Sequence, residues 1–109
     1  MLNFRKLKQD FSSFVLKEGN ALFKDKMVLS AKIIHLGSDS LKINAQVRGS
    51  FGNTNECEIE VDRQESEIVD SNCDCPYSYD CQHLAGLLFY LEKYFLYLSE
   101  NELLLCMIE

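Results

Sequence analysis

Two stretches in the middle of the chain alternate between apolar and polar residues. They span residues 41–48 and 56–62. A period of two places successive side chains on opposite faces, so each stretch predicts a half-buried β-strand. An earlier strand at about residues 27–36 and a later one at about residues 65–72 are expected to complete an antiparallel sheet of three to four strands.

The two alternating stretches predict a hairpin with one register that suits both of its faces. Across a loop at residues 49–53, this register sets Ala45 opposite Ile59 on the apolar face. On the polar face it sets Arg48 opposite Glu56, which is a favourable charge pair. Agreement between the two faces favours this pairing.

The N-terminal region shows apolar residues at helical spacing. The residues that share one face are Phe4, Leu7, Phe11 and Phe14. Gly19 follows at the position of a left-handed C-terminal cap. The pattern therefore predicts one helix over about residues 3–17.

The C-terminal region predicts a helix that is apolar around most of its circumference. It starts after Asp80, which is an acceptable N-cap, and carries leucines and aromatic residues on several faces. Ser99 and Glu102 have capping-box spacing and predict a last helix that runs to residue 109. So much apolar surface predicts self-association through these helices or contact with another segment. The alternative is that the N-terminal helix packs across them.

These elements predict one α+β domain over residues 1–109. It begins with an N-terminal helix at 1–18 and continues with the antiparallel sheet at 27–72. A segment with three cysteines and one histidine, which leads into a helix, follows at 73–98, and a final short helix occupies 99–109.

Cysteine content and hydropathy indicate a cytoplasmic protein with reduced thiols. Five cysteines are an odd number for a disulfide scaffold. The apolar stretch Phe14–Leu16 is too short for a signal peptide or a membrane span. We therefore expect no membrane partner.

Charge is distributed unevenly along the chain. Residues 1–48 hold nine basic and four acidic side chains, whereas residues 49–109 hold two basic and thirteen acidic ones. Phosphate binding needs Lys and Arg, so the C-terminal half alone is a poor candidate for nucleic-acid contact.

Four residues with metal-binding side chains follow the last predicted strand in the pattern Cys73-x-Cys75-x5-Cys81-x-His83. Zinc needs four such donors in a tetrahedron, and two ligand pairs joined by a short loop supply them. Cys81 and His83 fall in the first turn of the predicted helix, whose dipole favours thiolate. The pattern predicts one structural Zn²⁺ per chain. Four protein ligands close the shell, so we predict no catalytic residues and no enzymatic activity.

This pattern, followed by the helical run LAGLLFYL, resembles the SWIM zinc finger, which has the form CxCxnCxH leading into a helix. The preceding strands are similar to the sheet before the finger in bacterial members, so the resemblance covers about residues 18–95. It implies an N-terminal accessory domain of a Swi/Snf-type helicase-like ATPase. Gln82 departs from the family, which very often has lysine before the histidine, and this weakens the case for direct phosphate contact by the helix.

Three other metal-binding side chains are better explained as structural residues. Cys57 lies on the inner face of a predicted strand, and Cys106 lies among leucines. His35 sits in a strand without a nearby cysteine or carboxylate and is interpreted as a structural histidine.

The expected partner is a helicase-like ATPase core, in the same chain or a separate one, or else another protein or DNA. The alternative function is a stand-alone DNA-binding zinc module. Its phosphate surface would consist of the basic residues Arg5, Lys6, Lys8, Lys24, Lys26 and Lys32. A third possibility, a zinc enzyme, requires an open coordination position.

Overall fold

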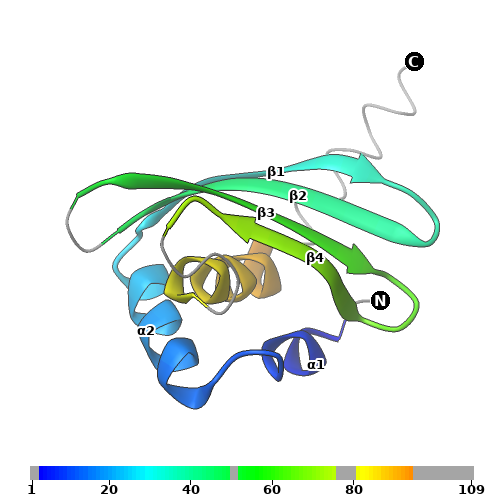
Figure 1. The fold of residues 1–109 in the computed structure, drawn as a ribbon, viewed down its shortest axis with the longest axis horizontal. Helices are drawn as coiled ribbons and strands as arrows, with labels where there is room; N and C mark the ends of the chain where they lie inside the picture. Colours follow the sequence, from blue (N-terminus) through cyan, green and yellow to red (C-terminus); the bar gives the residue numbers. More distant parts are fainter. Residues whose placement is uncertain (1–2, 50–51, 76–80, 95–109) are drawn as a thin grey trace.

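Helices cover one face of a four-stranded antiparallel sheet (Figure 1). The structure is a computed structural model, which describes residues 3–49, 52–75 and 81–94. Its elements in chain order are α1 (Phe4–Lys8), α2 (Ser13–Lys24), β1 (Val28–Leu36), β2 (Ser40–Arg48), β3 (Thr54–Asp62) and β4 (Glu67–Cys73). Residues 82–94 form a further helix, which we call the central helix. The predicted α+β class is confirmed.

The N-terminal region contains two helices, so the prediction of one helix over about residues 3–17 is wrong. The Asn3 side chain caps α1 and accepts a hydrogen bond from the Lys6 amide at 3.2 Å. Ser12 caps α2 in the same way and accepts from the Val15 amide at 3.3 Å. Such side-chain bonds satisfy amides at the start of a helix, so Ser12 starts a new helix rather than extending the first.

The break between α1 and α2 splits the predicted apolar face. Leu7 and Phe11 are buried, whereas Phe14 is 70% exposed at the start of α2. Gly19 is not a C-terminal cap, because it lies in the middle of α2 and is buried there. Because Gly19 has no side chain, α2 can cross the helix that contains Ala85 and Gly86 at close range.

The predicted hairpin forms between β2 and β3, but its register is shifted by two residues. Ala45 pairs with Cys57 rather than with Ile59. The strands stay paired up to the loop, where the Gly49 amide donates to the Asn53 carbonyl at 2.7 Å. Because the shift is even, the predicted apolar side chains keep their place on the inner face.

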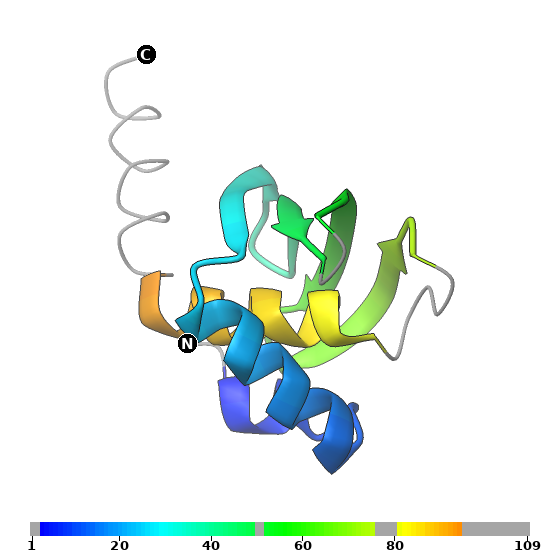
Figure 2. The same cartoon turned by 90° about the vertical axis from the view of Figure 1, so that its left-hand side faces the viewer.

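The central helix lies between the sheet and α2 (Figures 1 and 2). Its fully buried side chains are Leu84, Ala85, Leu87, Leu88 and Leu91. They join a core that includes the inner face of β2 and β3, with Leu41, Ile43, Ala45, Val47, Cys57, Ile59 and Val61. Burial on two sides explains why the sequence of this helix is apolar around most of its circumference.

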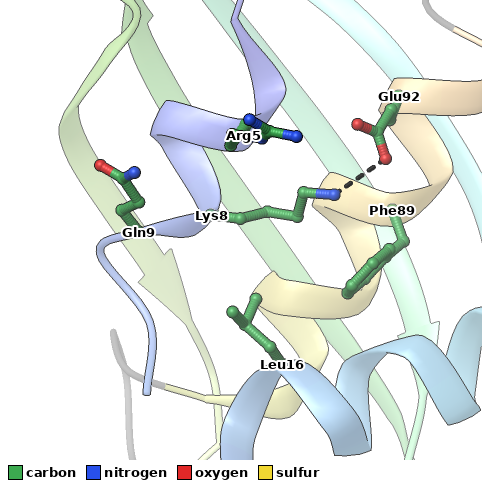
Figure 3. A pocket seen from close by; sticks show the side chains of 6 residues that line it. All are labelled: Arg5, Lys8, Gln9, Leu16, Phe89 and Glu92. Carbon is green, nitrogen blue, oxygen red and sulfur yellow. Dashed lines mark hydrogen bonds and ion pairs between the residues drawn. The ribbon is translucent and has the colours of Figure 1, made fainter. Parts of the chain in front are cut away.

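A pocket opens between α1, α2 and the central helix (Figure 3). Lys8 Nζ lies 2.9 Å from a carboxylate oxygen of Glu92 and 4.5 Å from the centroid of the Phe89 ring. Phe23 of α2 meets Tyr90 edge to face, with ring centroids 6.5 Å apart. The N-terminal helices thus pack on the central helix, while self-association of the chain stays a prediction.

Some predicted features lie outside the described residues. They include the last helix at 99–109, Cys106, and Asp80 in the segment 76–80. Within the described ranges, no helix combines the length and the apolar character needed to cross a membrane.

Replacing Gly19 with alanine tests the close crossing of α2 and the central helix. The new Cβ would lie 2.6 Å from the Ala85 Cβ and 2.7 Å from the Gly86 amide nitrogen, which is backbone and cannot easily move. We expect Gly19→Ala to lower the free energy of unfolding by about 2 kcal/mol, despite a gain of about 1 kcal/mol in helix propensity. Urea denaturation of the zinc-loaded protein measures this change.

Gly86→Ala is the matched control within the same crossing. The nearest atom to its new Cβ is the Gly19 carbonyl oxygen at 3.2 Å, so its effect should be clearly smaller. Equal losses in the two variants would contradict the close contact at Gly19.

Candidate metal centre

Four metal-binding side chains meet where the sheet ends and the central helix begins. Cys73 is the last residue of β4 and Cys75 follows it, while Cys81 precedes the central helix and His83 lies in its first turn. Their ligand atoms all lie within 4.8 Å of one another. Cys75 is half-buried and the other three are buried. The structure therefore brings together all four residues that the sequence predicted, and we call them the Cys3His cluster.

Pairing between β3 and β4 positions the first two cysteines. Cys73 stands directly opposite Cys57. Asp74 continues the pairing beyond the strand, because its amide donates to the Glu56 carbonyl and its carboxylate accepts from the Glu56 amide, both at 3.2 Å. Asp74 lies in a bend after β4, and its two hydrogen bonds to Glu56 hold this bend against β3, where Cys73 and Cys75 both contribute their sulfur atoms to the cluster.

Cys81 is the N-cap of the central helix. Its carbonyl accepts from the Ala85 amide at 3.1 Å, and its Sγ accepts from the Leu84 amide at 3.4 Å. The metal-binding residue itself therefore caps the helix, while Asp80, which the sequence suggested, lies outside the described residues. The hydrogen bond and the positive end of the helix dipole both favour the thiolate that a metal requires.

One pair of donors already has the spacing of a tetrahedral zinc site, and all four donors lie within 4.8 Å of one another. Zn–S bonds of about 2.3 Å and Zn–N bonds of about 2.0–2.1 Å place neighbouring donors about 3.6–3.8 Å apart. Cys73 Sγ and His83 Nδ1 lie 3.7 Å apart. Three cysteines and one histidine are a common donor set of structural zinc sites, and four protein ligands complete the coordination shell.

The second nitrogen of His83 has a partner that the sequence did not reveal. The Asn55 amide nitrogen lies 3.2 Å from His83 Nε2. With Nδ1 facing the cysteines, Nε2 carries the proton, so the acceptor is the Asn55 amide oxygen after a half-turn of the amide group. Asn55 pairs with the buried Val47 on the inner face of β3. A polar residue at an inward position was the available signal, but reading it requires the correct register.

The clustered thiols shift the protonation of one another. Hydrogen bonds from Cys57 and Cys81 lower the pKa of the Cys73 thiol below its usual range. The same hydrogen bonds, followed by burial, raise the pKa of Cys57 and of Cys81. Zinc binding therefore has to displace protons from this group of coupled thiols.

Two other metal-binding side chains considered from the sequence, Cys57 and His35, are not among the four residues of the Cys3His cluster. Cys57 is buried in the core as predicted, but its Sγ also lies 3.3 Å from Cys73 Sγ, so it borders the Cys3His cluster. His35 is exposed on β1, and no group of metal-binding side chains in the described ranges includes it.

Comparison with known protein families matches residues 55–92 to the SWIM zinc finger. The matched segment begins in β3, ends in the central helix and contains the whole Cys3His cluster. Residues 55–92 are therefore a SWIM-type zinc-binding module, and Zn²⁺ is its cofactor. The match includes no catalytic family. No curated protein and no solved structure matches the chain.

Native mass spectrometry tests the assignment of the four ligands. We expect one zinc per chain, and we expect Cys75→Ser to lose it, because a hydroxyl replaces a thiolate and three donors remain. Cys57→Ser should lower stability but keep the zinc. Chelation of the wild-type protein should abolish cooperative thermal unfolding, because metal-binding energy is folding energy in such sites. Loss of zinc in Cys57→Ser together with retention in Cys75→Ser would show that the assignment is wrong.

Replacing Asn55 with alanine tests its role behind His83. Without the Asn55 side chain as acceptor, the imidazole ring of His83 is free to turn, so zinc affinity should fall by about 10- to 100-fold. Asn55→Asp keeps an acceptor and should retain affinity. Competition with a zinc-binding dye measures the change, and Asn72→Ala on the exposed part of β4 is the control. Equal affinities for Asn55→Ala and Asn72→Ala would rule out this role.

Proposed function

We propose that this chain is a non-catalytic interaction module of a Swi/Snf-type helicase-like ATPase that works in the cytoplasm. It would act as an N-terminal part of that protein or as a separate subunit. The observation that carries the proposal is the closed Cys3His cluster, with four protein donors within 4.8 Å of one another. A complete shell leaves no position for an activated water, so the zinc has a structural task.

The link to an ATPase is supported by the SWIM character of residues 55–92 and by the resemblance to bacterial Swi/Snf proteins. In this proposal, zinc fixes the sheet against the central helix, and the outer surface of the domain meets the partner. The ATPase activity itself belongs to the partner or to another part of a longer protein.

Charge on the outer face of the sheet favours a protein partner over nucleic acid. Across β3 and β4, Glu60 pairs with Asp70, and Asp62 pairs with Glu67. Like charges directly opposite each other cost stability, and together they repel phosphate. The acidic residues at alternate positions of β3 are Glu56, Glu58, Glu60 and Asp62.

Part of the basic charge of the N-terminal half is neutralised within the chain. Lys6 Nζ lies 3.7 Å from a carboxylate oxygen of Glu67, and Lys8 forms its ion pair with Glu92. DNA binding, the second candidate function, would therefore depend on the other basic residues of the predicted phosphate surface, which are all exposed. These residues are Arg5, Lys24, Lys26 and Lys32.

Purification of the natural protein from its cells, through an affinity tag at its own gene, tests the proposed partner. We expect a Swi/Snf-type ATPase either in the tagged polypeptide itself or bound to it in equal amount. Mass spectrometry of the purified material identifies it, and an untagged strain is the control. Recovery of the 12.6 kDa chain without such an ATPase would refute the proposal.

Gel retardation of a short DNA duplex separates the second candidate from the first. The proposal expects no retardation by the zinc-loaded protein at low salt. Retardation would favour the DNA-binding function if it weakens steeply with salt, by a slope of about 0.9 for each phosphate contact, and disappears in the triple variant Lys24→Glu, Lys26→Glu, Lys32→Glu. The matched control is the single variant Lys8→Glu, since that lysine already pairs with Glu92.

A further inference from the structure

Cys57 contacts the zinc site without belonging to its four donors. It stands directly opposite Cys73 in the pairing of β3 with β4, and the two sulfur atoms lie 3.3 Å apart. Its side chain is fully buried. A tetrahedral site with four protein ligands needs no fifth thiol, so the position of Cys57 calls for a separate explanation.

We propose that Cys57 and Cys73 form an oxidation site, at which a hydroperoxide converts the two thiols into a disulfide and thereby releases the zinc. The inference rests on the zinc site and is independent of the proposed ATPase partner.

Backbone geometry selects this pair of cysteines over others in the cluster. Residues directly opposite each other in antiparallel strands have Cα atoms about 4.5–5.5 Å apart, which suits a disulfide. Cys73 and Cys75 are separated by one residue in a bend of the chain, so a disulfide between them would close a small, strained ring. The Cys57–Cys73 bond therefore needs the smaller change in the backbone.

The reaction consumes one hydroperoxide molecule, taken here as hydrogen peroxide. The Cys73 thiolate sulfur attacks a peroxide oxygen, the O–O bond breaks, and the departing hydroxide takes up a proton from solvent to become water. Cys73 is then a sulfenic acid. The Cys57 sulfur attacks the Cys73 sulfur, the S–O bond breaks, and the second hydroxide takes the Cys57 proton. Two thiols lose two electrons, and two waters form.

Loss of Cys73 from the donor set weakens zinc binding. Cys75, Cys81 and His83 remain, and three protein donors hold zinc less tightly than four. The disulfide also joins β3 to β4 at the point where the pairing already exists, so the sheet keeps its register. Oxidation therefore acts on the junction with the central helix rather than on the sheet.

Burial restricts which thiol can react with an oxidised Cys73. Cys57 is 0% exposed and Cys73 is 2% exposed, whereas Cys75 is half-buried at the edge of the cluster. A small peroxide reaches a buried thiol more easily than a bulky thiol such as glutathione does. Cys57 and Cys81 both lie next to Cys73, but Cys57 is outside the four donors, so its thiol is the one left to react.

Treatment of the zinc-loaded protein with hydrogen peroxide tests the proposal. Released zinc is measured with a chromogenic chelator, and the disulfide is located by peptide mass spectrometry. Trypsin cleaves after Arg63 and Lys93, so the proposed bond links peptide 49–63 to peptide 64–93. A second cleavage before Asp74 separates Cys73 from Cys75. We expect one zinc released per disulfide, and recovery of zinc binding after reduction with dithiothreitol.

Two variants control this experiment. Cys57→Ala should form no link between the two peptides and should recover zinc binding poorly after reduction, because its Cys73 oxidises further to a state that dithiothreitol does not reduce. Cys106→Ala removes a thiol outside the described residues and should behave as the wild-type protein does. A disulfide confined to peptide 64–93 in the wild-type protein would overturn the proposal. Equal recovery of zinc binding by wild type and Cys57→Ala after reduction would also overturn it.

Discussion

Metal coordination by two short segments holds the sheet of this protein against its central helix. Cys73 and Cys75 come from the end of β4, while Cys81 and His83 come from the start of the helix. The remaining support at this junction is burial of the helix leucines against the sheet. A chain of 109 residues has a limited core, whereas a structural zinc supplies on the order of 10 kcal/mol of binding energy. We therefore expect the folding of this half of the domain to depend on the metal.

β3 controls the site although it provides none of the four donors. Its inner face presents Asn55 to His83 and Cys57 to Cys73, at 3.2 and 3.3 Å respectively. Both contacts depend on the register of β3 with its neighbours, so the sheet determines the orientation of the imidazole and the surroundings of one thiolate. The same register leaves acidic side chains on the outer face. One strand thus links the chemistry of the metal site to the surface that we assign to a protein partner.

Features of the fold that depend on local spacing could be predicted from the sequence. Alternation around Ile43 and Ile59 identified two strands, and the spacing from Cys73 to His83 identified the donor set. Features that depend on distant contacts could not. The hairpin register was missed by two residues because an even shift keeps the same apolar side chains inside. The break before Ser12 was missed because helical periodicity continues across it. The contacts of Asn55 and Cys57 with the metal site could be recognised only once the register was known.

X-ray absorption spectroscopy of the zinc-loaded protein tests the central claim most directly, because it counts the sulfur and nitrogen atoms bound to the metal. The account predicts three sulfurs at about 2.3 Å and one nitrogen at about 2.0–2.1 Å. A shell of four sulfurs would show that Cys57 has taken the place of His83. A bound oxygen would show an open site, and either result would contradict the closed Cys3His centre.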